Sequence, residues 1–319
     1  MRAPPERRTA SDLVCVRESR DPGEIEAAMG GDRAYCAYAL AHLDPPRFER
    51  TRFWLARRAD GAGGLVVQAR GNGRTMILVG DPTAIGAALA LHPGPSFAYL
   101  ATAAPEHLPA LAATHEAADR LSMHRMRATA DSFRPAPDAP ADPDELPLRR
   151  LSGLDVAALN QLYRAGGAAA HYTASDIERL PYWGAFDGRR LAAVAGTHVV
   201  SPGRGVGVVG NVMTHPAYRS RGLGTRVTGA VTATLLARGA RLVALSVDPQ
   251  NVRAVRAYRR LGYERTADVV EARLVRRPAE GLRAWWRRLR ARRRSEGRGE
   301  EWIEVRRRPP GDARGGGTA

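Results

Sequence analysis

The sequence contains no lysine, so all 49 of its basic residues are arginines. This absence excludes a Walker-type phosphate loop, which needs a lysine to reach the outer phosphates of a nucleotide. The sequence has only 33 acidic residues, Asp and Glu together, so its formal net charge is +16. The complete loss of lysine points to a coding bias. The charge itself favours anionic partners.

Cysteines and long apolar runs are scarce as well. Cys15 and Cys36 have neither metal-ligand spacing nor disulfide density, so we expect ordinary small apolar residues and no metal site. The longest charge-poor stretch, 82–105, is interrupted by prolines and predicts a buried helix, turn and strand instead of a membrane span. No apolar segment precedes the first acidic residues, so we expect no signal peptide and a cytoplasmic location.

Acidic residues are missing altogether from 188–247, a stretch that contains eight arginines. This composition suits a polyanionic ligand such as a nucleotide phosphate, although a solvated basic face has the same composition. A second concentration of charge lies in 276–319, which has 14 arginines and six acidic residues. The chain therefore has one basic segment inside a folded region and one basic tail.

A Pro- and Asp-rich segment without apolar periodicity, 134–146, predicts a linker between two folded parts. We expect an N-terminal domain over 1–133, a second domain over 147–277 and a tail over 278–319. In the first domain, apolar segments predict strands at 53–58, 65–70, 75–79, 97–102 and 123–129, and helices at 82–92 and 106–120. In the second, they predict strands at 148–151, 182–186, 191–200, 206–214 and 242–247, helices at 152–163, 223–237 and 251–261, and a final strand pair around 263–274. The fold class is mixed α/β.

A glycine-bearing turn, 219–225 (Arg-Ser-Arg-Gly-Leu-Gly-Thr), follows a predicted strand and opens a predicted helix. Free backbone N–H groups and the helix dipole make such a turn an anion-binding site. A dinucleotide fingerprint would need a third glycine at 227, where the sequence has Val227. A different phosphate-binding loop is therefore indicated.

The pattern Arg-x-x-Gly-x-Gly, formed by Arg219, Gly222 and Gly224, resembles the pyrophosphate-binding motif of the GNAT N-acetyltransferase superfamily. A second pattern, Asn-x-x-Ala-x-x-x-Tyr-x-x-x-Gly-Tyr, starts at Asn251 and also resembles that superfamily. It places Asn251 and Tyr258 seven residues apart, on one helix face. The resemblance covers the cofactor-binding half of the family's domain and extends more loosely over 147–275.

The resemblance implies a GNAT fold in the C-terminal lobe and acetyl-CoA as co-substrate. By resemblance, the residues expected to bind the cofactor are Val212, Met213, Thr214, Arg219, Arg221, Gly222, Leu223, Gly224, Thr225 and Asn251. The runs 195–198 and 210–216 look like a glycine N-acyltransferase-like subgroup, in which a degenerate GNAT-like lobe comes first. Here the first lobe has Gly-Asp-Pro at 80–82 and no Arg-x-x-Gly-x-Gly, so we expect it to have a structural or substrate-binding role.

Acyl transfer to an amine needs a proton donor for the leaving thiolate and a neutral nucleophile. Resemblance gives the donor role to Tyr258, although an aromatic packed between helix and sheet would look the same. Many relatives have a carboxylate on the strand before the loop, but 206–214 has none. His198 is the nearest alternative base; a structural histidine or a chain of waters remains open. His171 and Tyr172 lie where relatives bind the acceptor.

The basic tail contains an apolar stripe of Leu282, Trp285, Trp286 and Leu289 on an arginine-rich segment. Such a helix suits an anionic membrane surface, nucleic acid or another part of this protein, and a partly disordered tail is the alternative. The function predicted for the whole chain is N-acetyl transfer from acetyl-CoA to a primary amine. Two alternatives stay open: a catalytically weak acyl-CoA-binding regulator, and an adaptor acting through the tail.

Overall fold

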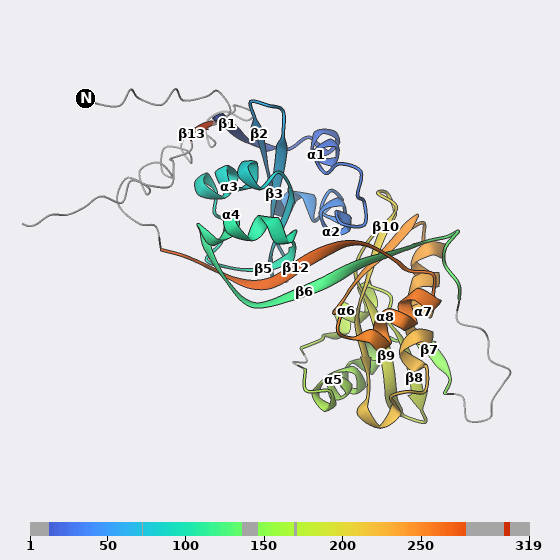
Figure 1. Ribbon diagram of the computed structural model, residues 1–319. Coiled ribbons are helices and arrows are strands. Elements are labelled where there is room, and N and C mark those ends of the chain that lie inside the picture. Colours follow the sequence, from blue (N-terminus) through green and yellow to red (C-terminus); the bar gives the residue numbers. More distant parts are fainter. Residues whose placement is uncertain (1–12, 72, 136–145, 169–170, 279–302, 307–319) are drawn as a thin grey trace, which may run out of the picture.

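The computed structural model describes residues 13–71, 73–135, 146–168, 171–278 and 303–306. These residues form one mixed sheet of 13 strands, with helices on both of its faces (Figure 1). Its N-terminal lobe consists of β1 (Leu13–Ser19), α1 (Pro22–Ala28), α2 (Ala37–Ala41), η2 (Phe48–Arg50), β2 (Thr51–Arg58), β3 (Gly63–Arg70), β4 (Arg74–Gly80), α3 (Pro82–Leu91), β5 (Phe97–Thr102), η3 (Pro105–His107), α4 (Leu108–Ala112) and β6 (His115–Thr129).

The C-terminal lobe repeats this order of strands and α-helices. It consists of β7 (Leu148–Arg150), η4 (Gly153–Asp155), α5 (Val156–Ala165), α6 (Ala174–Arg179), β8 (Trp183–Asp187), β9 (Arg190–Ser201), β10 (Val206–Thr214), η5 (Pro216–Tyr218), α7 (Leu223–Ala237), β11 (Leu242–Val247), α8 (Val252–Arg260) and β12 (Glu264–Arg276). Each lobe has one parallel strand pair, β4 with β5 and β10 with β11. The strand β13 (Ile303–Arg306), from the C-terminal segment, pairs antiparallel with β1.

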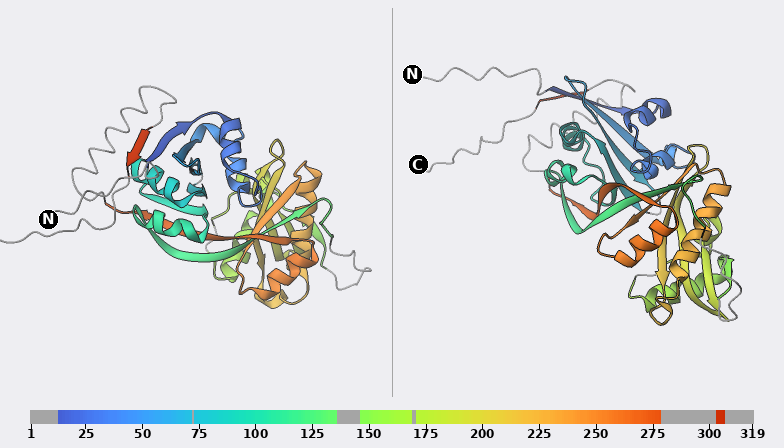
Figure 2. Two further views of the ribbon diagram at one scale, coloured as in Figure 1. Left: turned by 45° about the horizontal axis from the view of Figure 1, so that its top comes forward. Right: turned by 45° about the vertical axis from the view of Figure 1, so that its right-hand side comes forward.

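The two lobes exchange their last strands. The strand order is β13-β1-β2-β3-β4-β5-β12-β6-β11-β10-β9-β8-β7, so β12 pairs with β5 of the first lobe and β6 pairs with β11 of the second. The long strands β6 and β12 also pair with each other and run side by side between the lobes in both views of Figure 2. Backbone hydrogen bonds therefore join the lobes along the whole crossing.

Apolar packing joins the lobes a second time. Leu40 and Ala41 of α2 belong to the same buried cluster as Val206 and Val208 of β10. Removing one leucine-sized side chain from water contributes about 1.5–3 kcal/mol. Polar contacts add to this seam, since Arg33 donates to the backbone carbonyl of Arg204 at 2.6 Å. Residues of the first lobe are thus held against the second.

Most elements lie where the sequence predicts them, but two predictions are wrong. The helix expected over 106–120 ends at Ala112, and 115–120 belongs to β6. Alanines and a glutamate give this segment a high helix propensity, but pairing with β12, as between Ala117 and Leu274, overrides it. The final strand pair expected around 263–274 is one continuous strand, β12.

Three further observations bear on the expectations from composition. Cys15 and Cys36 are both free thiols, and Cys36 is buried. No helix in the described ranges is long and apolar enough to cross a membrane. Within those same ranges, no three His, Cys, Asp or Glu side chains come together as metal ligands. The predicted tail helix around 281–290 lies outside the described residues, and only 303–306 of the tail beyond Pro278 is described.

Candidate active site

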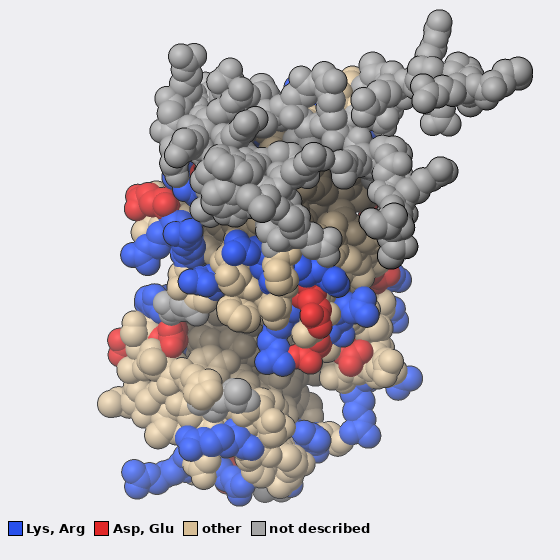
Figure 3. All heavy atoms as spheres, turned by 90° about the vertical axis from the view of Figure 1, so that its left-hand side faces the viewer, with Lys and Arg blue, Asp and Glu red and all other residues tan. Residues whose placement is uncertain are grey.

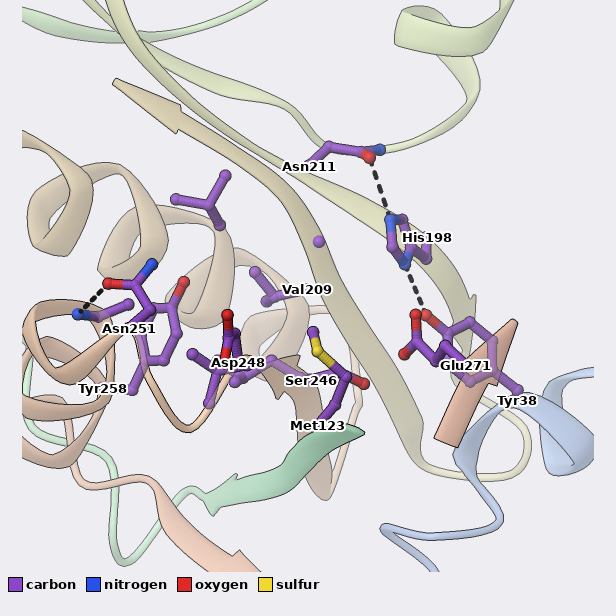
Figure 4. A pocket seen from close by; sticks show the side chains of 15 residues that line it. Tyr38, Met123, His198, Val209, Asn211, Ser246, Asp248, Asn251, Tyr258 and Glu271 are labelled. Atoms are coloured by element: carbon purple, nitrogen blue, oxygen red, sulfur yellow. Dashed lines mark hydrogen bonds between the residues drawn. The ribbon is translucent and has the colours of Figure 1, made fainter. Parts of the chain in front are cut away.

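The candidate site lies where β10 and β11 separate. Their parallel pairing covers only Val206–Val208 against Leu242–Ala244, and a bulge then interrupts β10 between Gly210 and Met213. Asn211 in this bulge has a positive φ of 55°, a conformation that asparagine tolerates better than most residues. Between the two strands opens a cavity of about 310 Å³, which we call the central cavity (Figure 4). It is lined by Tyr38, Met123, His198, Val209, Gly210, Asn211, Val212, Leu245, Ser246, Val247, Asp248, Asn251, Ala254, Tyr258 and Glu271.

The predicted anion-binding turn begins α7 without a side-chain cap. Gly222 is the N-cap residue, in the left-handed conformation at φ 72°, and its side-chain position faces open space. The first amides of the helix, at Leu223 and Gly224, have no acceptor among the described groups. Free N–H groups at the positive end of a 15-residue helix suit a phosphate. The turn therefore suits a phosphate or pyrophosphate group.

A second cavity, of about 710 Å³, lies over this turn, and we call it the loop cavity. Its lining includes nine of the ten residues predicted to bind cofactor: Val212, Met213, Thr214, Arg219, Gly222, Leu223, Gly224, Thr225 and Asn251. Arg221 is the exception, and its guanidinium lies 5.4 Å from the centre of the Tyr218 ring. The sequence reasoning missed Arg253, Arg256 and Arg260 of α8, which also line this cavity and raise its positive charge.

The corresponding turn of the N-terminal lobe is occupied by the protein itself. Asp81 caps α3 by accepting from the amide of Ala84 at 2.8 Å, and Arg58 lies 3.4 Å from its carboxylate. A carboxylate at this helix end takes the place that a phosphate would need. A side chain at Gly80 would lie 2.4 Å from the carbonyl of Gly63, so the turn is also closely packed. This geometry agrees with a degenerate first lobe.

Tyr258 on α8 lines both the central cavity and the loop cavity, and Figure 4 shows its side chain beside Asn251 in the central cavity. Its side chain is only 7% exposed, and its ring packs against Tyr263. Burial raises the pKa of Tyr258 to about 12, so the hydroxyl keeps its proton at neutral pH. Burial is the only cause of this shift, and no hydrogen bond to this hydroxyl occurs among the described residues. Asn251 begins the same helix and accepts from the amide of Ala254 at 3.2 Å.

His198 on β9 is held between two side chains. Its Nδ1 lies 2.6 Å from the hydroxyl of Tyr38, and its Nε2 lies 3.1 Å from Oδ1 of Asn211. The amide nitrogen of Asn211 donates to the hydroxyl of Tyr182 at 2.9 Å, so its oxygen faces the imidazole. The neutral ring therefore carries its hydrogen on Nε2 and accepts the Tyr38 hydroxyl at Nδ1.

Burial lowers the pKa of His198 below its ordinary value, and the hydrogen bond from Nε2 to Asn211 offsets part of this effect. Glu271 also offsets part of it through its charge. Figure 4 shows Glu271 beside Tyr38 at the end of the central cavity opposite Tyr258. Sequence reasoning missed both residues, because Glu271 reaches the site on the exchanged strand β12 and Tyr38 comes from the other lobe. Two acidic residues, Asp248 and Glu271, therefore line the central cavity, although β10 carries none.

A third cavity, of about 840 Å³, lies between the lobes, and we call it the interlobe cavity. Both residues predicted to bind acceptor, His171 and Tyr172, line it. The Tyr172 ring lies 5.0 Å from that of Tyr163 and 6.1 Å from that of Tyr182, centre to centre. The interlobe cavity shares His198 and Asn211 with the central cavity. The three cavities therefore follow one another, from the turn before α7 to the lobe interface.

Comparison with known families matches one segment of this chain. Residues 157–263 match the acetyltransferase (GNAT) family. This segment is a GNAT acetyltransferase domain. It contains β10, the turn before α7, and both Asn251 and Tyr258. The match confirms the superfamily resemblance, whereas the glycine N-acyltransferase-like subgroup stays a hypothesis.

Solved structures confirm the fold over more than four fifths of the chain. A GCN5-related N-acetyltransferase from Sphaerobacter thermophilus has a TM-score of 0.51 at 19% identity, covering 83% of this chain and 96% of its own. A Drosophila protein has a TM-score of 0.57 at 14% identity, covering 82% and 98%. A tandem GNAT protein from the clavulanic acid biosynthesis pathway has a TM-score of 0.50 at 14% identity, covering 84% and 100%. No curated protein sequence matches this chain.

Proposed function

We propose that the GNAT domain of this chain transfers an acetyl group from acetyl-CoA to a primary amine. The family uses acetyl-CoA as its co-substrate. The observation that carries the proposal is the row of three adjoining cavities. The uncapped start of α7, the Tyr258 hydroxyl and the His198 imidazole lie along this row. One end of this path fits phosphate, and the other opens at the lobe interface.

Binding begins at the loop cavity. The amides of Leu223 and Gly224 would donate to the pyrophosphate, and the arginines of the turn and of α8 would add charge. The bulged segment of β10, Val212–Met213, lies where the two strands separate, so its backbone can contact the pantetheine arm. Asn251 lines both the loop cavity and the central cavity. The acetyl group would then lie in the central cavity.

Tyr258 is the proposed acid. Its hydroxyl keeps its proton up to about pH 12, has no described partner and faces the cavity into which the thioester would extend. As the amine forms its bond to the acetyl carbon, the C–S bond breaks and the leaving sulfur takes up negative charge. A positioned hydroxyl donates a proton or a hydrogen bond to it, an effect worth about 10²–10⁴-fold in rate.

His198 is the proposed base, acting together with Tyr38. Its lowered pKa keeps the imidazole neutral at neutral pH. Because Nδ1 accepts the Tyr38 hydroxyl, the amine proton would pass to the Tyr38 oxygen as the Tyr38 proton moves to Nδ1. The positive charge on His198 is then balanced in part by Glu271, whose charge raises the pKa of the ring. A water chain to the same imidazole would serve this step equally.

The test combines binding with turnover. We expect acetyl-CoA and CoA to raise the melting temperature of the purified protein, because a ligand that binds only the folded state stabilises it. A panel of amines with acetyl-CoA should then release free thiol in proportion to acetylated amine. Binding without thiol release from any amine would favour the regulator. Absence of both would exclude the proposed function.

A further inference from the structure

We propose that the acceptor is an anionic amine, whose carboxylate or phosphate group binds to arginines of both lobes in the interlobe cavity. This inference rests on the proposed function and adds the class of acceptor. The lining of the cavity contains four arginines, Arg47, Arg50, Arg70 and Arg179, and one acidic residue, Asp176. Figure 3 shows the hollow between the lobes on one face, with basic side chains and several acidic ones on the upper lobe along its edge.

The single carboxylate in the lining is already used. Asp176 accepts from the amide and the hydroxyl of Thr173, at 3.0 and 2.7 Å, in a capping arrangement at the start of α6. It also pairs with Arg179 at 2.8 Å. One acid therefore balances one of the four arginines, and the cavity keeps a net positive charge.

The other three arginines have no such partner. The guanidinium groups of Arg47, Arg50 and Arg70 make no hydrogen bond or ion pair with any residue in the described part of the chain. Asp44, the acid whose charge acts on Arg47, is hydrogen-bonded to the hydroxyl of Ser201 and faces Arg204. A guanidinium presents a planar set of donors that matches a carboxylate or a phosphate. Three of them around one cavity favour an anionic ligand.

Arg47 and Arg179 line the interlobe cavity from different lobes. Burial lowers the pKa of Arg47, with Asp44 offsetting part of the effect and the charge of Arg179 adding to it. Two like charges close enough to affect each other, one of them half-buried, are stabilised when an anion lies between them. The same cavity reaches His198 and Asn211. An anion held at the arginines would leave the amine of the same molecule directed to the central cavity.

The phosphates of CoA do not account for these arginines. The loop cavity has its own arginines, and its lining shares no residue with that of the interlobe cavity. The central cavity, with Tyr258 and His198, lies between the two. The two basic regions are therefore on opposite sides of the proposed reaction centre, as expected for a donor and an acceptor that are both anionic.

Matched pairs of amines test the proposal. Aminoalkanoates from glycine to 6-aminohexanoate would be compared with alkylamines of the same length, and O-phosphoethanolamine with ethanolamine. We expect the anionic member of at least one pair to have a kcat/KM roughly 10- to 100-fold higher, as for hydrogen bonds to charged groups. Preference within the first or the second series distinguishes carboxylate from phosphate.

Variants locate the effect. Arg47→Gln and Arg179→Gln should raise the KM for the preferred anionic amine roughly 10-fold or more, with KM for its neutral counterpart and affinity for acetyl-CoA unchanged. Arg74→Gln is the control, since Arg74 is exposed on the same β3–β4 hairpin as Arg70 but does not line the cavity. Equal use of neutral and anionic amines, or variants that behave as wild type, would overturn the proposal.

Calorimetry on the CoA-loaded protein separates this inference from the proposed function. Binding of the anionic amines that is weakened by Arg47→Gln, but without acetylation, would support the anion site and contradict the acetyl transfer. Acetylation of neutral amines alone would support the acetyl transfer and contradict the anion site. Each of the two statements can therefore fail by itself.

Discussion

The hydroxyl of Tyr38 on α2 and Nδ1 of His198 on β9 lie 2.6 Å apart, although the two residues belong to different lobes. The first lobe thus contributes a side chain directly to the proposed reaction centre. Under the proposed function this lobe would do more than pack against the second, even though Asp81 occupies the start of its own helix.

The first prediction concerns His198. His198→Gln should lower kcat/KM about 10²–10⁴-fold and remove the acid limb of its pH profile. In the wild type this limb should lie below about pH 6.5, the ordinary pKa of histidine, because burial lowers the pKa of His198. Tyr38→Phe should lower the rate but keep the acid limb, since the imidazole is still present. A folded His198→Gln protein with an unchanged pH profile would exclude the base role.

The second prediction separates chemistry from packing at Tyr258. Tyr258→Phe should lower kcat about 10²–10⁴-fold, while the dissociation constant of acetyl-CoA and the melting temperature stay nearly the same. Tyr263→Phe is the matched control, because its hydroxyl is buried and hydrogen-bonded to Thr232 at 2.7 Å. That variant should lose about 1 kcal/mol of stability and keep its kcat. Wild-type turnover in Tyr258→Phe would assign proton donation to another group.

The third prediction tests the turn before α7. The double variant Gly222→Val and Gly224→Val should abolish the thermal shift by acetyl-CoA, because Gly222 has a φ of 72° and branched side chains would cover the free amides. Gly61→Ala is a control for backbone strain, since Gly61 has a φ of 89° and open space around it in the first lobe. Undiminished CoA binding by the double variant would contradict the assignment.

The fourth prediction concerns the tail. Truncation after Arg277 should leave the dissociation constant of acetyl-CoA nearly unchanged and reduce retention on heparin, which salt should weaken in the full chain. The pairing of β13 with β1 adds an expectation that the sequence did not supply. Removing β13 exposes the edge of β1, so the truncated protein should also melt at a lower temperature. Full heparin retention after truncation would place the basic surface elsewhere.

The local parts of the site could be predicted from the sequence. The helix α7, its glycine start and the strand β10 have the predicted bounds because apolar periodicity and turn residues are short-range signals. The same signals placed Asn251 and Tyr258 on one helix, and both line the central cavity. A motif with fixed spacing therefore predicted which side chains come together in the second lobe.

The contributions of the first lobe could not be predicted in this way. Tyr38, Arg47 and Glu271 reach the site through the exchange of β6 and β12 and through the packing of α2 on β10. Such pairings depend on contacts between residues far apart in the chain, and nothing in the local sequence indicates them. The missed strand at 115–120 has the same cause, because its partner β12 lies more than a hundred residues later in the chain.

The exchange of last strands also constrains how the chain is made. During synthesis on the ribosome, β5 cannot pair with β12 until late, because β12 is the last strand of the two lobes to be translated. In the same way, β6 cannot pair with β11 before β11 has been translated. Neither half can complete its sheet in the native order before β12 is released. A protease that cuts within 134–146 should accordingly yield two fragments that stay associated and active, since β6 and β12 would still cross between them. We therefore expect the two lobes to unfold as one cooperative unit, although their elements repeat.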